Sequence, residues 1–239
     1  MGKSGAIRFL SYNIHGCVGW DRRETPELTL EVIRRTGADV VALQEVYDND
    51  DAALSFLRGL ETLPHEALVY GSTLRRHPGS YGNVLVSRFP LSDVRQVDLS
   101  VRGREPRGAI RAVLRTAGGP VTLVAAHLGL SRAERATQFR TLAGLWGDNG
   151  TAGGAAGEVL MGDFNEWAPW SRRMRDLRRC FDVCSRARTF PSVLPLFALD
   201  RICVRGPGVT ARFDGPRVPG AGRASDHLPL VADVRFSRG

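Results

Sequence analysis

The stretch EVLMGDFNEW, residues 158–167, decides how this sequence is interpreted. Its apolar run EVLM is typical of a buried strand. The run leads directly into two carboxylates and an amide, at Asp163, Glu166 and Asn165. Either these polar groups form an ordinary turn, or they form one corner of an active site. The polar residues at the ends of the other predicted strands distinguish a turn from an active site.

Short apolar runs of this kind recur along the whole chain and alternate with helical patterns. Several are continuous, which is typical of strands in a sheet that is covered on one or both faces. The order predicts one α/β sandwich domain over residues 1–239, with a flexible loop at 147–157 and a hairpin-like turn at 215–222. The predicted strands are 7–12, 39–43, 83–87, 109–114, 121–128, 158–164, 200–204 and 228–236, and the predicted helices are 25–37, 48–60, 131–146 and 170–179.

The chain is strongly basic. Its 239 residues carry a formal net charge of +8, and Lys3 is the only lysine. This charge favours a polyanionic partner such as nucleic acid, a phospholipid surface or a phosphorylated metabolite. The skew toward arginine is also what a biased genome composition would produce. We expect a cytoplasmic protein without stable membrane insertion, because the sequence has neither an apolar run of membrane-spanning length nor a signal-peptide pattern. We expect a monomer because no interface signature stands out.

The four cysteines, Cys17, Cys180, Cys184 and Cys203, lack the spacing of a zinc site. Disulfides are not expected for a chain of this length and compartment. We therefore predict that these residues are buried thiols.

Polar residues stand next to nearly every predicted strand. Carboxylate and amide oxygens suit Mg²⁺ or Mn²⁺, and two histidines remain for acid–base chemistry. Such a set can promote the attack of water on a phosphate ester. Each residue alone is equally compatible with a turn, a cap or a structural hydrogen bond, so the prediction depends on the joint pattern. The residues are Asn13, Gln44, Glu45, His127, Asp163, Asn165, Asp200, Asp226 and His227.

The order of these residues resembles that of the endonuclease/exonuclease/phosphatase superfamily, which includes deoxyribonuclease I. The resemblance covers nearly the whole chain and is strongest to small bacterial members. It implies an α/β (α+β) fold of four layers, in which two mixed, mainly antiparallel sheets pack together with helices outside. The motifs that carry it are NIH (13–15), LQE (43–45), AHL (126–128), GDFN (162–165), LDRI (199–202) and SDH (225–227).

The resemblance also implies roles for individual residues. Glu45 would be the main ligand of Mg²⁺ or Mn²⁺, with Asn13 close by and Asp226 as a further carboxylate of the metal site. Asp163 would orient or deprotonate the attacking water, and Asn165 would hold that water or a phosphate oxygen.

The two histidines complete the implied catalytic set. His227, oriented by Asp200, would contact the phosphate or serve as the base. His127 would stabilise charge on the phosphoryl oxygens or assist the leaving group.

Four further residues are candidates for substrate binding. Arg107 is able to clamp a phosphate through its planar guanidinium, and Glu105 is a candidate partner of His127. Tyr81 and Asn83 precede a strand and are candidates to line the cleft. A solvated loop and a strand-entry turn explain these residues equally well.

The predicted function is a metal-dependent phosphoester hydrolase, and first a phosphodiesterase or nuclease that acts on nucleic acid. The alternative substrate is an inositol phosphate or a phospholipid headgroup, because the same catalytic residues would serve it. A non-catalytic binding module is the third hypothesis, and it is disfavoured because every catalytic residue is present.

Overall fold

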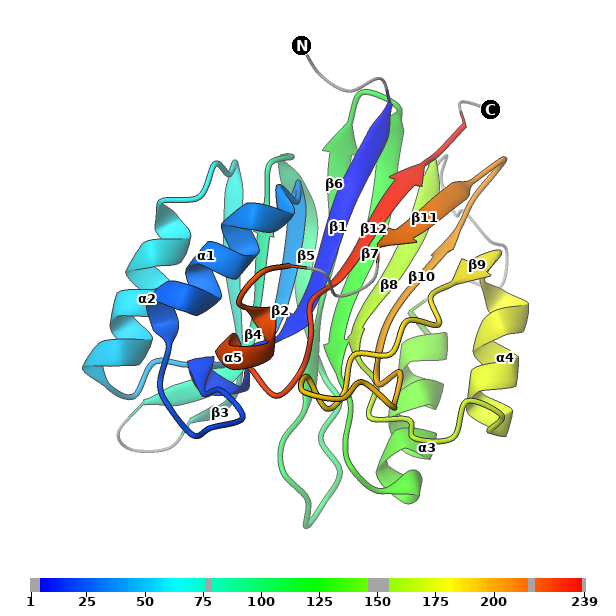
Figure 1. The fold of residues 1–239 in the computed structure, drawn as a ribbon. Coiled ribbons are helices and arrows are strands. Elements are labelled where there is room, and N and C mark those ends of the chain that lie inside the picture. The colour runs from blue at the N-terminus through cyan, green and yellow to red at the C-terminus, as the bar shows by residue number, and fades with distance from the viewer. Residues whose placement is uncertain (1–4, 76–78, 146–154, 215–217, 238–239) are drawn as a thin grey trace.

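Two six-stranded sheets pack face to face, and helices cover their outer faces (Figure 1). The computed structural model describes residues 5–75, 79–145, 155–214 and 218–237. The first sheet has the order β11 (Thr210–Asp214), β12 (Leu230–Arg235), β1 (Ala6–Asn13), β2 (Val40–Tyr47), β4 (Ser80–Ser87) and β3 (Ala67–Arg75). The second has the order β5 (Leu91–Asp98), β6 (Gly108–Thr116), β7 (Gly119–His127), β8 (Gly157–Asp163), β10 (Asp200–Arg205) and β9 (Val183–Cys184).

The helices form the two outer layers. On the first sheet lie α1 (Pro26–Thr36), α2 (Asp51–Glu61) and the short α5 (Ala221–Ala224), and on the second lie α3 (Arg132–Ala143) and α4 (Arg172–Cys180). Local sequence explains their ends. Pro26 stands in the first turn of α1 and Gly37, at φ 60°, ends it. In α3, the side chains of Ser131 and Glu134 form a reciprocal capping box.

Strand alternation divides the apolar side chains among three cores. In β1, Phe9 faces the second sheet while its neighbour Leu10 faces the helices. In β8, Met161 faces the first sheet and Leu160 faces α3 and α4. The predicted four-layered sandwich is confirmed.

The same alternation places polar side chains between the sheets at one end. Asn13 lies four residues after Phe9, Asp163 two after Met161, and Asp200 two before Ile202, so each shares a face with a residue of the central core. His127 stands in the same relation to Ala125. β1 runs parallel to β2 and β7 parallel to β8, so the carboxyl ends of these strands meet at one edge.

The glycine of the GDFN segment has a structural role beside Asp163. Gly162 adopts φ +141°, and a Cβ atom there would overlap the carbonyl oxygen of Ala126 on the parallel neighbour β7. Glycine therefore lets β7 and β8 approach closely next to the polar strand ends.

The sequence prediction omitted β3, β5, β9 and β11. β5 has a largely exposed central part and β11 is half-exposed, so neither forms the apolar run by which strands were identified. α3 ends at Ala143 rather than at residue 146, with Gly144 as its C-cap. Of the predicted loop 147–157 and turn 215–222, residues 147–154 and 215–217 lie outside the described part of the chain.

The cysteines require a correction. Cys184 and Cys203 form a disulfide, whereas Cys17 is a buried thiol and Cys180 an exposed one. The two bonded residues lie directly opposite each other in the antiparallel pair β9–β10, with their Cα atoms 4.1 Å apart. The sequence alone did not indicate the pairing because β9 is only two residues long.

Within the described residues, no helix combines the length and the apolar character needed to cross a bilayer.

Candidate active site

The predicted catalytic and metal-binding residues come from strand ends and loops that meet at one end of the sandwich. Asn13 ends β1, His127 ends β7, Asp163 ends β8 and Asp200 begins β10. His227 precedes β12. All five side chains are buried. A site built on strand ends of two sheets is held rigidly by the cores behind it.

Glu45 reaches the site because β2 is irregular next to it. The pairing of β2 with β4 shifts register between Leu43 and Val46, and Glu45 takes φ 59°. Such a bulge redirects a side chain that regular alternation would point elsewhere. Asn13 Nδ2 donates to Glu45 Oε1 at 2.9 Å and to Asp163 Oδ2 at 3.1 Å. Asn13 thus links the carboxylates of the two sheets.

Asp163 is a buried carboxylate with several polar neighbours. Its Oδ1 accepts a hydrogen bond from the backbone N–H of Asn165 at 2.9 Å, and Asn165 holds the left-handed φ of 48° that this turn needs. Burial raises the pKa of Asp163 to about 6; the nearby charge of His227 opposes this rise and that of Asp200 adds to it. A carboxylate with such a pKa is ionised at neutral pH and is a stronger base than an exposed aspartate.

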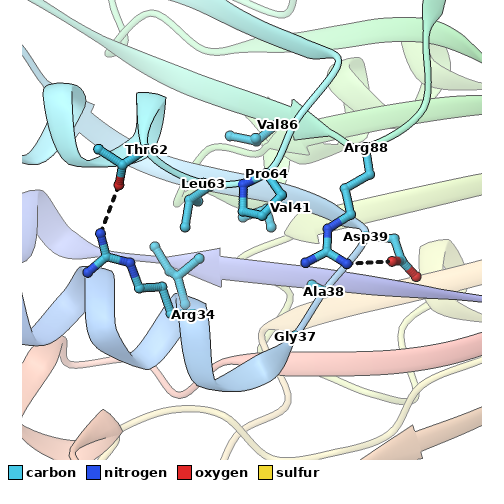
Figure 2. Close-up of a pocket in the computed structure, with 11 residues that line it drawn as sticks. Arg34, Gly37, Ala38, Asp39, Val41, Thr62, Leu63, Pro64, Val86 and Arg88 are labelled. Atoms are coloured by element: carbon cyan, nitrogen blue, oxygen red, sulfur yellow. Dashed lines mark hydrogen bonds and ion pairs between the residues drawn. The ribbon is translucent and has the colours of Figure 1, made fainter. Parts of the chain in front are cut away.

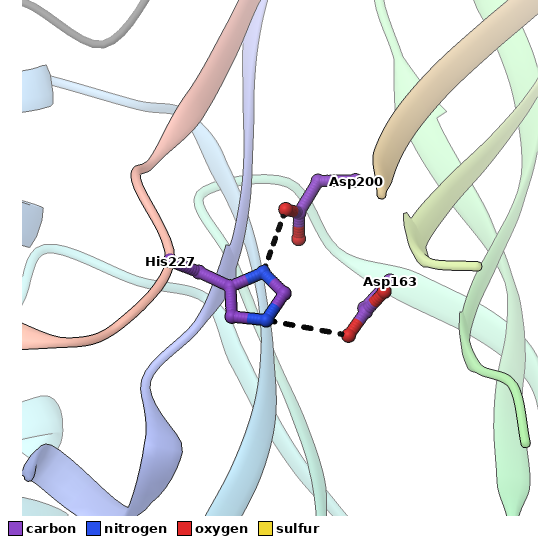
Figure 3. Close-up of side chains that lie close together, drawn as sticks. All are labelled: Asp163, Asp200 and His227. Atoms are coloured by element: carbon purple, nitrogen blue, oxygen red, sulfur yellow. Dashed lines mark hydrogen bonds and ion pairs between the residues drawn. The ribbon is translucent and has the colours of Figure 1, made fainter. Parts of the chain in front are cut away.

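His227 lies between two carboxylates, as Figure 3 shows. Its Nδ1 is 2.9 Å from Asp200 Oδ2, and its Nε2 is 3.8 Å from Asp163 Oδ2. Thr189 donates to the same Asp200 oxygen, and the ring of Phe190 packs against the imidazole at 4.8 Å. Burial alone would lower the pKa of His227, but the charges of Asp200 and Asp163 outweigh it and raise the pKa to about 10. At neutral pH His227 is therefore a fixed cation.

We expect Asp200→Asn to lower the pKa of His227, because it removes the charge that contributes most to keeping the ring protonated. Nitrogen chemical shifts of labelled histidine in the metal-free protein measure this change. In the wild type the raised pKa adds stability that is complete below the ordinary histidine pKa of about 6.5 and is lost as the pH rises through about 10. An unchanged midpoint in the variant would show that Asp200 does not support the charge.

His127, in contrast to His227, is a neutral imidazole. Arg107 Nη1 lies 3.0 Å from His127 Nδ1 and can only donate, so Nδ1 accepts and the ring proton is on Nε2. Burial, and then the positive charges of Arg107 and His227, lower the pKa of His127 well below its ordinary value. The ring is neutral and presents Nε2–H to the site. Asn165 Nδ2, which donates to the carbonyl of Leu128 at 2.9 Å, lies 3.4 Å from Nε2, so a second donor group stands beside the ring.

The candidate substrate-binding residues form hydrogen bonds within the protein. Arg107 was expected to clamp a phosphate, but its side chain is only 5% exposed and it also donates to Tyr81 and to Glu105. Glu105 was a candidate partner of His127, but it accepts from Arg107 Nη2, whereas the His127 ring contacts Arg107 Nη1. Asn83 donates to the backbone of Gly108 and so connects β4 to β6. In this geometry Arg107 and Tyr81 set the tautomer of His127.

The residues present fit a hard divalent cation at Glu45. Its side chain is 20% exposed, and its Oε2 has no hydrogen-bond partner in the described part of the chain. Asn13 Oδ1 accepts a single hydrogen bond, from His15 N, and so keeps one lone pair. Asp226 is half-exposed next to Ser225, which donates to the carbonyl of Asn13. These are oxygen ligands with open positions, as Mg²⁺ and Mn²⁺ prefer.

A second group of potential ligands consists of Asp163, Asp200 and His227. Both ring nitrogens of His227 already face carboxylates, and the ring is protonated. We therefore interpret this group as a proton-holding cluster rather than as a cation site.

Another hollow, of about 230 Å³, lies between the end of α1 and the segment after α2 (Figure 2). Arg34 donates to Thr62 there, and Arg88 pairs with Asp39. Asp39 precedes β2, whereas Glu45 lies near the other end of that strand. This hollow is therefore at the opposite end of the sandwich from the candidate active site.

Two contributors to the site were not foreseen from the sequence. Thr189 hydrogen-bonds Asp200, and Phe190 packs on His227. Neither belongs to a motif, and both are brought in by the irregular segment between β9 and β10, so no sequence signal indicated them.

Comparisons with known proteins give the family of this chain. Residues 10–227 match the model of the endonuclease/exonuclease/phosphatase family. The chain is 32% identical to the uncharacterized protein YbhP of Escherichia coli K12, over 97% of each chain. The structure resembles an endonuclease/exonuclease/phosphatase of Beutenbergia cavernae, with a TM-score of 0.74 and 22% identity over 98% of this chain and 72% of that chain. It also resembles one of Bacteroides vulgatus, with a TM-score of 0.75 and 19% identity over 97% of this chain and 99% of that chain. The chain belongs to the endonuclease/exonuclease/phosphatase family and is a hydrolase of phosphoester bonds.

Proposed function

We propose that the protein is a divalent-metal-dependent phosphodiesterase that acts on nucleic acid by in-line attack of water. The observation that carries this proposal is the convergence of Asp163, His127 and His227 with Asn13 and Glu45 at one end of the sandwich. Asp163 is the buried base, His227 is a fixed cation, and His127 is a neutral donor. Such a set supplies a base, a cation and a hydrogen-bond donor for the hydrolysis of a phosphate diester.

Each group has a defined task in the proposed reaction. Asp163 accepts a proton from the attacking water, and Asn165 N–H holds the carboxylate in place. Protonated His227 cannot be the base at neutral pH, so it offsets negative charge on the phosphate. His127 Nε2–H and the amide of Asn165 are placed to donate to a phosphoryl oxygen as charge accumulates on it.

Glu45, Asn13 and Asp226 would hold Mg²⁺ or Mn²⁺, with Glu45 as the main ligand. The cation would supply Lewis-acid stabilisation of the phosphoryl and departing oxygens.

A phospholipid headgroup is the second candidate substrate. The observation that favours it is a turn of apolar residues beside the site, in which Val193, Leu194 and Leu196 are 50% to 62% exposed. Exposed aliphatic side chains near a cationic surface are typical of proteins that contact lipid.

A substrate panel tests the proposal. Single- and double-stranded DNA, RNA, bis-p-nitrophenyl phosphate, inositol phosphates and sphingomyelin vesicles are incubated with Mg²⁺, with Mn²⁺ and with chelator. We expect cleavage of nucleic acid that stops in chelator. Cleavage confined to sphingomyelin or inositol phosphates would replace nucleic acid by the second candidate, and metal-independent cleavage would contradict the proposed mechanism.

A further inference from the structure

A groove of about 570 Å³ lies beside the candidate active site, on the outer face of the second sheet. Four arginines and several aromatic side chains line it. We call it the arginine–aromatic groove and define it by Arg178, Arg186, Arg188, Arg201, Trp167 and Phe197. It lies between the segment that follows Asn165, the start of β10 and the segment that precedes Asp200.

Ring contacts connect the groove to the catalytic residues. Trp167 packs edge-on against Phe197 at 4.9 Å and against Phe190 at 5.6 Å. Phe190 in turn packs against the imidazole of His227. Asp200 and Arg201 are consecutive on β10, so one faces the catalytic cluster and the other faces the groove. The groove is therefore connected to His227 through the rings of Phe190 and Trp167.

Three of the four arginines of the groove have no charged partner in the described part of the protein. Within the described residues, Arg178, Arg186 and Arg188 form no ion pair and no side-chain hydrogen bond. The only carboxylate among the described lining residues is Glu166, and it already contacts Arg173 at 2.8 Å and Arg135 at 3.5 Å, neither of which lines the groove. The cluster therefore favours an anionic ligand from outside the chain.

Arg201 makes this a built site rather than a patch of surface charge. Its side chain is 1% exposed, and its buried Nε has no hydrogen-bond partner among the described residues. Only Nη1 is fixed, by the carbonyl of Ser185 at 2.9 Å. Burial, and then the charges of Arg178 and Arg186, lower the pKa of Arg201 to about 10, although the charges of Asp200 and Glu166 oppose this fall. Holding a buried guanidinium against other guanidiniums is unfavourable unless an anion joins them.

The apolar lining indicates what accompanies the anion. Trp170 is 73% exposed, and Trp167, three residues before it, is 40% exposed. Exposed indole rings beside arginines provide flat faces for planar groups, and nucleic-acid bases stack on such rings when they are unpaired. Bases in a duplex are already stacked and paired, so they do not offer their faces.

We propose that the arginine–aromatic groove binds the nucleotide that flanks the scissile phosphate of a single-stranded nucleic acid. Its phosphate contacts the arginines, and its base lies against the tryptophans. The inference rests on the proposed function of the neighbouring site and narrows the substrate to unpaired strands.

The test measures binding and not cleavage. A labelled short oligothymidylate is titrated with the protein in chelator, and anisotropy is followed at several salt concentrations. We expect Arg186→Gln and Arg188→Gln each to weaken binding several-fold and to reduce the slope of log K against log salt by about 0.7, because each removes about one phosphate contact. We expect Trp170→Ala to weaken binding about tenfold without changing the slope, because stacking involves no counterion release. Arg58→Gln, on the remote helix α2, is the matched control and should bind as the wild type does.

Several results would overturn the inference: wild-type protein that does not bind the oligonucleotide, groove variants that bind like Arg58→Gln, or tighter binding to duplex than to single strand. Groove substitutions that release the protein from phosphatidylglycerol vesicles but not from the oligonucleotide would assign the groove to lipid and also overturn it. Hydrolysis of bis-p-nitrophenyl phosphate by the wild-type protein tests the catalytic site separately. Its absence would contradict the proposed function without bearing on the binding result.

Discussion

Asp163→Asn is expected to lower kcat on bis-p-nitrophenyl phosphate by about 10³-fold, because the base that accepts the proton from water is lost. The amide has nearly the size of the carboxylate, and its single oxygen can still accept from Asn165 N, whereas its NH₂ group replaces the oxygen that accepts from Asn13 Nδ2. The bond that holds the turn is therefore retained while the basicity is removed. KM should change little, since Asp163 is proposed to act on water rather than on substrate.

The thermal midpoint separates this effect from unfolding. Burial raises the pKa of Asp163, so the charged form is disfavoured in the folded protein, and replacing it by a neutral amide should not lower Tm. Glu158→Gln is the matched control. Glu158 is a buried carboxylate at the other end of the same strand, 2.5 Å from Arg205, and its loss should affect Tm rather than kcat. Equal losses of kcat in the two variants would contradict the role given to Asp163.

The pH dependence gives an independent check of the same residue. With a pKa of about 6, Asp163 takes up a proton as the pH falls through that value, so kcat/KM of the wild type should decline on the acid side. The residual activity of Asp163→Asn should lack this acid limb. An acid limb that persists in the variant would assign the titration to another group.

Much of the fold could be predicted because the strands that build the centre of each sheet are apolar runs. The pairs β1–β2 and β7–β8 are of this kind, and they carry most of the motif residues. The edge strands escaped prediction for a physical reason. A strand such as β5, with an exposed central part, owes its conformation to pairing with β6, and sequence patterns do not report pairing partners.

The candidate site was predictable to the extent that strand alternation determines it. Asn13, Asp163 and Asp200 share inner faces with core residues, so position along the strand places them together. Glu45 departs from that rule through a bulge, and its orientation was not predictable from periodicity. The relation of Glu105, Arg107 and His127 was also not predictable, because it depends on which of two neighbouring charged side chains reaches the ring.

The protonation states follow from which charged partner each histidine has. His227 faces Asp200 and keeps its proton, whereas His127 faces Arg107 and remains neutral. Two residues of one type thereby supply a cation and a neutral donor to the same site. In the proposed function, this division assigns the role of base to Asp163 and places the cation at Glu45.

Glu45→Gln is the second change with a large expected effect. We expect Mn²⁺ affinity to fall by at least about tenfold, and kcat/KM at fixed metal to fall by about 10²–10³-fold, because the substitution removes the anionic oxygens that suit a hard cation. The amide remains able to accept from Asn13 Nδ2, so Asn13 should stay in place. Calorimetric titration of Mn²⁺ into the metal-free protein measures the affinity without reference to activity.

Asp39→Asn provides the control for this measurement. Asp39 is a carboxylate at the opposite end of β2, where it accepts from the backbone of Arg8, and it should not affect metal binding. Excess Mn²⁺ should restore part of the activity of Glu45→Gln, because Asn13 and Asp226 still offer oxygen ligands. Unchanged Mn²⁺ affinity in Glu45→Gln, with loss of affinity in Asp200→Asn instead, would move the cation to the cluster of Asp163, Asp200 and His227. The fixed charge assigned to His227 would then be untenable, since a ring nitrogen that binds a metal cannot hold a proton.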